Sequence, residues 1–302
     1  MATVPSDSLC YPAKIAHGHI VDLVEKGITK IFYPCEPYNM EDDVNASDNH
    51  FNCPIVASYA ENIRGNMDIL RDRNIDFIQP FLPIHDRKRL VERLYEELGE
   101  REKLSKQEIA AAVEAAYAEI ERYRQDVRDY GQKILARIEK TGEQAIMLVG
   151  RPYHIDPEIN HGIPEMIQSY KLPILSEDAV YHIPVKAERL KVVNQWSYHA
   201  RLYHAAQFTA EHQNLTLIQF SSFGCGLDAL TTGQVKEILE DHHRIYTMIK
   251  LDEVSNLGAA RIRLRSLMAA LARRKPVAYK EVRPIERPHF TEDCKATHTI
   301  LA

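Results

Sequence analysis

Short apolar runs alternate with amphipathic stretches along the chain, and the alternation predicts two α/β regions. In the first region, apolar residues at helical spacing predict a helix over residues 12–26. Runs rich in β-favouring residues predict strands over 29–33 and 75–78, and Pro54 suits the first turn of a helix that reaches residue 64. Helices placed between short strands are typical of a parallel sheet, so we expect an α/β lobe over residues 1–85.

A long polar stretch with a helical pattern follows this lobe. Helices are predicted over 86–98 and 105–139, and Ser105 with Glu108 forms a capping box at the start of the second helix. Apolar residues recur along one face of that helix, whereas the other face is charged, as in a solvated helix between domains. We therefore expect a helical connector over residues 86–140.

The pattern after residue 141 predicts a second α/β lobe that extends to residue 302. We expect strands over 145–149, 172–175, 215–220 and 244–251, and helices over 163–169, 187–212, 228–239 and 257–272. The order of these elements favours a mostly parallel sheet. Ligands of such sheets bind outside the carboxyl ends of the strands, where Gly150 and Cys225 both lie. The predicted fold is thus two lobes, each with a mostly parallel sheet flanked by helices, joined by a long helix.

Four of the five cysteines stand beside proline or glycine. Their contexts are Cys10-Tyr11-Pro12, Pro34-Cys35, Cys53-Pro54 and Gly224-Cys225-Gly226. Thiolates that share a metal project from turns, because proline fixes the path of the chain and glycine avoids a Cβ clash. Zinc-ribbon and ferredoxin spacings are absent, so we expect an iron–sulfur cluster held in the cleft between the lobes by cysteines distant in sequence. Zinc or unliganded thiols remain alternatives, and Cys294 is expected to be a bystander.

Other polar residues suit roles near such a cluster. Arg151 directly follows a strand and can meet an anion, although a tight exit from the strand explains it equally well. We assign roles beside the cluster or toward substrate to His17, His19, His154, His161 and Arg261, with structural histidines and a solvated arginine face as alternatives. Neither G-x-G-x-x-G nor a Walker A sequence occurs, so we expect no ATP site in this chain.

Composition narrows the cellular setting. The net charge is −5 and the basic residues are scattered, which argues against a nucleic-acid partner. No apolar run approaches the roughly 20 residues that span a bilayer, and no secretory signal precedes the first helix. Five cysteines in 302 residues do not form a disulfide framework, so we expect a cytoplasmic protein with reduced thiols. The short segment before Cys10 and the β-favouring run at the end predict a fragment of a longer polypeptide.

Five ordered motifs together resemble one family. They are Cys10-Tyr11-Pro12-Ala13-Lys14 with His17-Gly18-His19, Asn52-Cys53-Pro54-Ile55-Val56, Gly150-Arg151-Pro152-Tyr153-His154 through Asn160-His161-Gly162, Phe223-Gly224-Cys225-Gly226-Leu227-Asp228-Ala229, and Ser255-Asn256-Leu257-Gly258-Ala259-Ala260-Arg261. The chain resembles the dehydratase-like region of the 2-hydroxyacyl-CoA dehydratase activase-related proteins. That region is similar to subunits of 2-hydroxyacyl-CoA dehydratases, benzoyl-CoA reductases and double-cubane cluster proteins of anaerobic metabolism.

The resemblance implies a cluster, of 4Fe-4S or double-cubane type, with Cys10, Cys53 and Cys225 as ligands and Cys35 as a fourth. It also implies an ATP-hydrolysing activase, fused in the full-length polypeptide, that supplies a low-potential electron for an acyl-CoA or another hard-to-reduce substrate. Three ligands would leave one iron open for a dehydratase-like or reductase-like component, whereas four would favour electron relay. The alternatives are a zinc-binding or apo scaffold that binds the activase, and a redox sensor that pairs Cys35 with Cys53. A homodimer is a further option.

Overall fold

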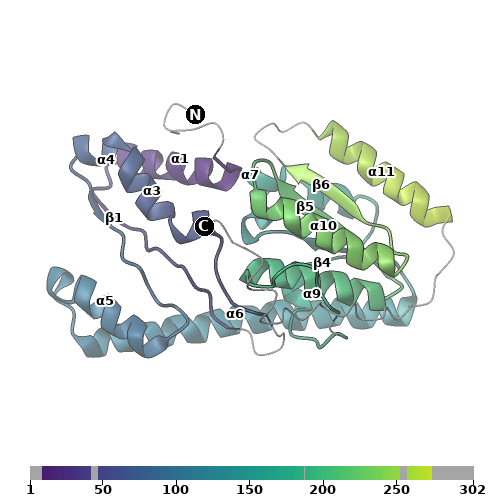
Figure 1. Ribbon diagram of the computed structural model, residues 1–302, viewed down its shortest axis with the longest axis horizontal. Helices are drawn as coiled ribbons and strands as arrows, with labels where there is room; N and C mark the ends of the chain where they lie inside the picture. The colour runs from purple at the N-terminus through teal and green to yellow at the C-terminus, as the bar shows by residue number, and fades with distance from the viewer. Residues whose placement is uncertain (1–8, 42–46, 187, 252–256, 274–302) are drawn as a thin grey trace, which may run out of the picture.

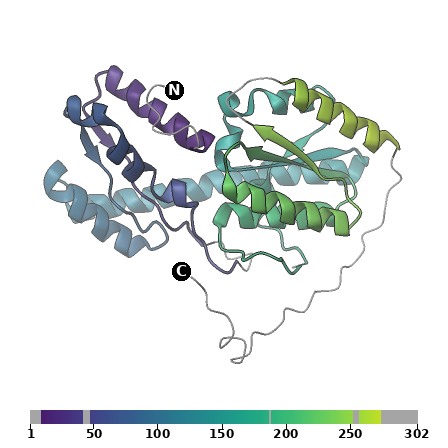
Figure 2. The same ribbon diagram turned by 45° about the horizontal axis from the view of Figure 1, so that its top comes forward.

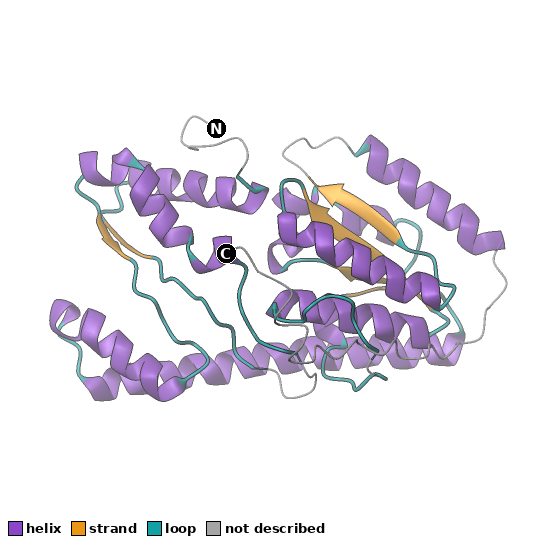
Figure 3. Ribbon diagram, viewed as in Figure 1, coloured by secondary structure: helices purple, strands orange, loops and turns teal. Residues whose placement is uncertain are grey.

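Two parallel sheets flanked by helices make up the computed structural model, which describes residues 9–41, 47–186, 188–251 and 257–273. Figure 1 labels the elements and Figure 3 shows how helices surround the strands. In chain order they are α1 Tyr11–Glu25, β1 Lys30–Phe32, α2 Pro54–Ala57, α3 Tyr59–Asn66, α4 Asp68–Asp72, β2 Asp76–Ile78, α5 Arg87–Glu102, α6 Lys106–Thr141, β3 Ala145–Val149, η1 Pro152–Ile155, α7 Pro157–Asn160, α8 Ile163–Gln168, β4 Ile174–Leu175, η2 Glu177–Ala179, α9 Ser197–Glu211, β5 Leu215–Ser222, α10 Gly226–Asp241, β6 Thr247–Leu251 and α11 Gly258–Arg273.

The larger sheet has the strand order β4-β3-β5-β6, and every pair is parallel. Its strands are largely apolar on both faces, as expected where helices cover both sides of a parallel sheet (Figure 2). Met147 of β3 packs into a core with α6, α9 and α10, while its neighbour Ile146 packs with α7, α8 and α11. Alternate side chains along one strand therefore hold the two helix layers in place.

The smaller sheet pairs β1 with β2 in parallel, with Ile31 opposite Phe77. Ile31 packs with Ile20 of α1 and Ile63 of α3 in a separate core. At its other end, α1 places Tyr11 and Ile15 against the core of the larger sheet. Helix α1 thus contacts both packed regions, and it begins where Cys10 lies.

Helix α6 is the long helix that the sequence predicts, and in Figure 1 it runs along the lower side of the molecule, from α5 to the region of the larger sheet. Its first turns bury Ile109 and Val113 against α5, and its last turns bury Leu135 and Ile138 under the larger sheet. The predicted capping box is present, since the Ser105 hydroxyl accepts a hydrogen bond from the N–H of Glu108 and the Glu108 carboxylate accepts one from the N–H of Ser105. The middle of the helix is left more exposed, with Tyr123 at 53%.

The predicted class, α/β with parallel sheets flanked by helices, is confirmed. Two helix predictions need correction. The helix expected over 54–64 is interrupted at Ser58. The Ser58 hydroxyl donates to the carbonyl of Pro54, which is the acceptor that the Ser58 N–H would use in a continuous α-helix, and that N–H bonds to the carbonyl of Ile55 instead. In the region expected as helix over 187–212, α9 begins only at Ser197, because the preceding described residues pair with another segment through the Phe51–Trp196 bridge.

The boundaries at residues 85 and 140 stay predictions. The capping roles of Ser255 and Asn256 and the position of Cys294 lie outside the described residues. Among the helices that the structure describes, none is both long and apolar enough to cross a membrane.

Candidate functional site

Three of the predicted cysteines occupy equivalent positions, each as the residue that precedes a helix. Cys10 is the N-cap of α1, Cys53 of α2 and Cys225 of α10. Proline at the start of α1 and α2 sets the backbone for the first helical turn. At α10 the thiol itself is the cap, because its Sγ accepts a hydrogen bond from the N–H of Asp228 at 3.4 Å. Residues far apart in sequence thus present their sulfurs from helix starts.

The same three cysteines are brought together around Arg151. Cys53 interacts electrostatically with both Cys10 and Cys225, and each of the three thiols interacts with the Arg151 guanidinium. Arg151 directly follows β3, and Cys225 follows β5, the strand paired with β3. The carboxyl ends of these two parallel strands therefore place the cation beside the Cys225 thiol.

Burial sets the protonation state of two of these thiols. It raises the pKa of Cys10, and it raises the pKa of Cys225 to about 11, with the neighbouring Asp228 carboxyl acting in the same direction. Both side chains are therefore protonated thiols at neutral pH unless a cation favours the thiolate. A bound metal supplies such a cation, and its binding would release protons.

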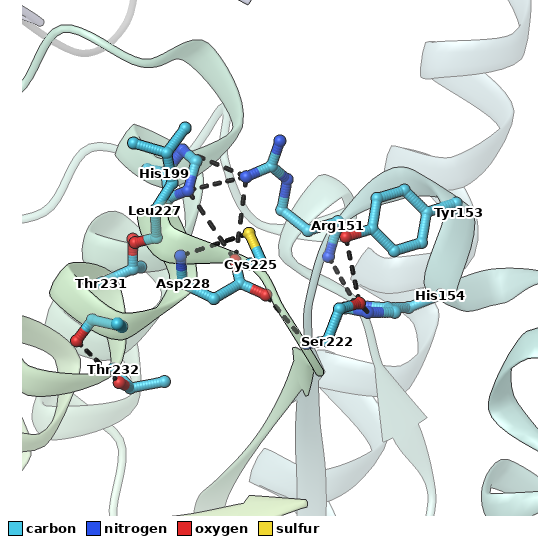
Figure 4. Close-up of polar contacts among 11 residues, drawn as sticks. Arg151, Tyr153, His154, His199, Ser222, Cys225, Leu227, Asp228, Thr231 and Thr232 are labelled. Atoms are coloured by element: carbon cyan, nitrogen blue, oxygen red, sulfur yellow. Dashed lines mark hydrogen bonds and ion pairs between the residues drawn. The ribbon is translucent and has the colours of Figure 1, made fainter. Parts of the chain in front are cut away.

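The side chain of Arg151 is only 4% exposed. Its Nη1 donates to Nε2 of His199 at 2.7 Å and lies 3.8 Å from Oδ1 of Asp228 (Figure 4). Burial, with the nearby guanidinium, lowers the pKa of His199 to about 2, so the imidazole is neutral and can accept this bond. Asp228 also accepts a hydrogen bond from the N–H of Ser222 at 2.9 Å, which ties the cation to the end of β5.

A second chain of polar contacts holds the residues after β3. The N–H of Arg151 donates to Nδ1 of His154 at 2.8 Å, so the proton of this neutral imidazole lies on Nε2. Nε2 then donates to the hydroxyl of Ser222 at 2.9 Å, and Ser222 lies 3.1 Å from the hydroxyl of Tyr153 (Figure 4). Burial lowers the pKa of His154 to about 3 and keeps it neutral. A Cβ at Gly150 would lie 2.4 Å from Nδ1 of His154, so this close packing requires glycine.

Cys35 lies elsewhere. It is fully buried, and its backbone pairs with the segment around Phe81 next to β2. Its sulfur accepts hydrogen bonds from the N–H groups of Glu61 and Ala60 at the start of α3. Burial raises its pKa, and the charged groups that act on it are Glu61 and Glu36 rather than other cysteines. The structure thus groups three of the four predicted cysteines and leaves Cys35 as a cap on α3.

The remaining predicted residues divide in the same way. Arg151 and His154 belong to the networks around Cys225, and His17 is buried with its Nε2 lacking a partner in the described part of the chain. His19 is exposed, His161 ends α7, and Arg261 lies on the exposed face of α11. Of these three, His19 shares the lining of a cavity with Arg151.

Sequence reasoning gave no role at this site to Asp228, Ser222 and Tyr59. Tyr59 lies close enough to Cys10 and Cys53 for both to act on its phenol, whose pKa is raised chiefly by burial. Asp228 could have been found from the sequence, because it lies three residues after Cys225. At that position in a helix the backbone N–H donates to the side chain of the capping residue. Ser222 and Tyr59 carry no such signal.

Two cavities adjoin this site. The larger, of 730 Å³, lies between one face of α1, β1 and the segment from Arg151 to Ile159. The smaller, of 440 Å³, is lined by the middle of α6 and the start of η2. Val56, Pro152, Ile155 and Tyr198 contribute to both walls.

The chain was compared with known protein families. Residues 1–180 match the family described as CoA enzyme activase uncharacterised domain (DUF2229). The chain belongs to this family. The match includes Cys10, Cys35, Cys53 and Arg151, whereas Cys225 lies beyond it. Neither the curated proteins nor the solved structures yielded a match to this member of the CoA enzyme activase-related family.

Proposed function

We propose that this CoA enzyme activase-related chain holds an iron–sulfur cluster on Cys10, Cys53 and Cys225. In this proposal it takes part in ATP-coupled, low-potential electron transfer from an activase to an acyl-CoA or another hard-to-reduce substrate. The observation that carries the proposal is the grouping of three thiols, distant in sequence, around one buried cation. Family membership supports the link to an activase.

The donor set favours a cluster over a single ion. Sulfur ligands select zinc or iron–sulfur centres. Within the described residues, no group of three or more His, Cys, Asp or Glu side chains is arranged to hold one metal ion. A cluster places each thiolate on a different iron, so its ligands stand farther apart than the ligands of one zinc ion. Three thiols that interact through space around one cation supply the soft ligands that such a cluster needs.

The charges around the thiols also fit. When bound, a cluster with three protein ligands accepts and passes on single electrons and leaves one iron open. Thiolates concentrate negative charge, and Arg151 supplies a buried positive charge that stabilises them. His154 and His199 are neutral, so their roles are to orient Arg151 and not to add charge. Nδ1 of His17 donates to the carbonyl of Ala13, so the unpartnered Nε2 of the neutral ring is a buried acceptor, and we assign it no hydrogen bond to the cluster sulfurs.

Cys35 is left out of the proposed ligand set, because the core encloses its sulfur completely and the charged groups that act on it are carboxylates and not Arg151 or the other thiols. A sensor that pairs Cys35 with Cys53 is less favoured, since Cys35 exposes no surface to an oxidant or a partner thiol. A zinc-binding or apo scaffold that binds the activase is the alternative that the experiment must separate.

The experiment is anaerobic reconstitution of the chain with iron and sulfide, followed by metal and sulfide analysis and by visible and EPR spectra. We expect a brown protein with about four irons per chain, or about eight for a double-cubane centre. Its reduced form should give an EPR signal of a low-potential cluster. A colourless protein that takes up zinc but no sulfide would contradict the proposal and favour the scaffold.

A further inference from the structure

The 730 Å³ cavity beside the cysteines has the character of a ligand site. One face of α1 forms its long wall through Ile15, Ala16, Ile20 and Leu23, and the opposite wall contains Tyr59, Arg151 and Tyr153. Its volume is in the range of small-molecule sites, which are mostly apolar with a few converging polar groups. Tyr59 and Tyr153 lie at the cysteine end, because Tyr59 interacts with Cys10 and Cys53 and Tyr153 interacts with Cys225. The lining also includes His19, Tyr33, Tyr198 and Asp156, whose carboxylate accepts a hydrogen bond from the N–H of Glu158.

The guanidinium of Arg151 has a free edge. Only Nη1 has hydrogen-bond partners in the described structure, and Nε is buried without one. Asp228 approaches Nη1 and so does not occupy the edge formed by Nε and Nη2 (Figure 4). Two parallel N–H groups on one edge of a guanidinium match the two oxygens of a carboxylate. A buried side chain with an unused pair of charged donors is costly unless a ligand completes it.

Tyr59 adds a second unused donor, since it lines the same cavity and lies close enough to Arg151 for the guanidinium to act on its phenol. Its hydroxyl makes no hydrogen bond to any residue that the structure describes, although the side chain is half-buried. Its ring stacks on Tyr33, with ring centroids 6.4 Å apart and an interplanar angle of 29°. Both rings line the cavity, so an aromatic or branched body can pack against them while an oxygen meets the hydroxyl.

We propose that this cavity binds a compact carboxylate with an apolar body. The two carboxylate oxygens would accept from the free edge of Arg151, and one of them also from the Tyr59 hydroxyl. The apolar part of the ligand would lie along α1. The carboxylate is favoured over a neutral carbonyl because its two oxygens can accept from both donors of the edge that Asp228 does not reach, in charge-assisted hydrogen bonds. This inference rests on the cavity and its donors, and it holds whether or not the cluster proposal does.

Binding can be measured by ligand-detected fluorine NMR on the anaerobically reconstituted chain. The probes are para-fluorophenylacetate, the corresponding amide, and para-fluorotoluene, which lacks the oxygens. We expect the carboxylate to bind about tenfold or more tightly than the amide, since charge-assisted hydrogen bonds are lost, and more tightly still than fluorotoluene. Equal affinity for the acid and the amide would overturn the inference.

Variants locate the binding site. Ala16→Phe should fill the cavity and abolish binding, whereas Glu25→Phe, on the exposed side of the same helix, should not. Tyr59→Phe keeps the ring and should weaken binding roughly threefold to tenfold. Unchanged binding in Ala16→Phe would overturn the assignment. Iron is measured in the same samples: no binding by an iron-loaded chain defeats this inference alone, and binding by a chain that takes up no iron defeats the cluster proposal alone.

Discussion

Cys35 and the three cysteines around Arg151 are alike in sequence context and differ in what faces their sulfurs. All four sulfurs lie at the start of a helix. The Cys35 thiol caps a helix from another segment and is enclosed by the core. The other three project from the starts of their own helices toward a buried cation and, through Tyr59 and Tyr153, toward a cavity. Neighbouring proline and glycine residues therefore show that a cysteine lies at a turn. The groups that surround its sulfur in the folded chain decide whether it is free to bind a metal.

The largest effect is expected from serine substitutions of the cysteines. Cys225→Ser should lose most of the reconstituted iron, as should Cys10→Ser and Cys53→Ser, because serine is a poor ligand for iron–sulfur clusters. Cys35→Ser should keep the iron content of the unmodified chain. Metal analysis and visible spectra measure the iron content of each variant. Loss of iron in Cys35→Ser with retention in Cys225→Ser would show that Cys35, and not Cys225, is the ligand.

Gly150→Ala tests whether the structure around Arg151 depends on the close packing of Gly150 against His154. The new Cβ would collide with His154 and approach Phe220, so we expect the free energy of unfolding to fall by about 2–3 kcal/mol. Gly18→Ala is the matched control, since nothing lies within 4 Å of its Cβ and α1 should gain about 0.5–1 kcal/mol. Denaturant unfolding measures both, and equal stability of the two variants would contradict the packing.

The region behind Arg151 also contains a buried carboxyl, and its pH dependence can be tested. Burial, with Asp178 acting in the same direction, raises the pKa of Glu177 from its ordinary 4.5 to about 8, although N–H groups of Glu177 and Gly150 and the charge of Arg201 oppose this. A raised pKa means that the folded state holds the proton more tightly than the unfolded state. The stabilisation is complete below pH 4.5 and is lost as the pH rises toward about 8.

Glu177→Gln should remove this dependence, which is about 1 kcal/mol per pH unit in that window. The measurement is the free energy of unfolding at several pH values between the two limits. Glu158→Gln, at an exposed position, serves as the control and should follow the unmodified chain. An unchanged slope in Glu177→Gln would show that Glu177 is not protonated in the folded state.

The smallest effect is expected for the stability of Cys35→Ser. The hydroxyl can still accept from the α3 N–H groups, but it exchanges a sulfur for a more polar group in a fully buried position. We expect a loss of about 1 kcal/mol in unfolding free energy. Thermal unfolding compares it with Cys225→Ser in the iron-free state, where the half-buried Cys225 should cost less. A larger loss at Cys225 would indicate that its thiol is the structural one.

Much of the fold follows from local patterns. The strand over 145–149 and the capping box at Ser105 are predicted to the residue, because apolar runs and capping chemistry act within a few positions. The interruption at Ser58 and the late start of α9 were missed. Both depend on contacts with other segments, such as the pairing of Phe51 with Trp196, which leave no periodic signal in the sequence.

The candidate site divides in the same manner. The turn context of the cysteines drew attention to Cys10, Cys53 and Cys225, and the position after β3 drew attention to Arg151. The sequence could not separate Cys35 from the others, because its neighbours also include proline. Tyr59 and Asp228 were missed as partners, since their importance comes only from the groups that surround them.

The sequence by itself determined most of the helices, the parallel strands and the placement of cysteines at chain turns, because these depend on side-chain periodicity and on the backbone limits of proline and glycine. Only the tertiary structure decided which thiols meet, that Arg151 is buried between them with an unused edge, and that an apolar cavity opens beside them. The physical reason is the separation along the chain over which each interaction acts. Capping and periodicity act over a few residues, whereas desolvation and electrostatic interaction depend on everything that the fold brings close.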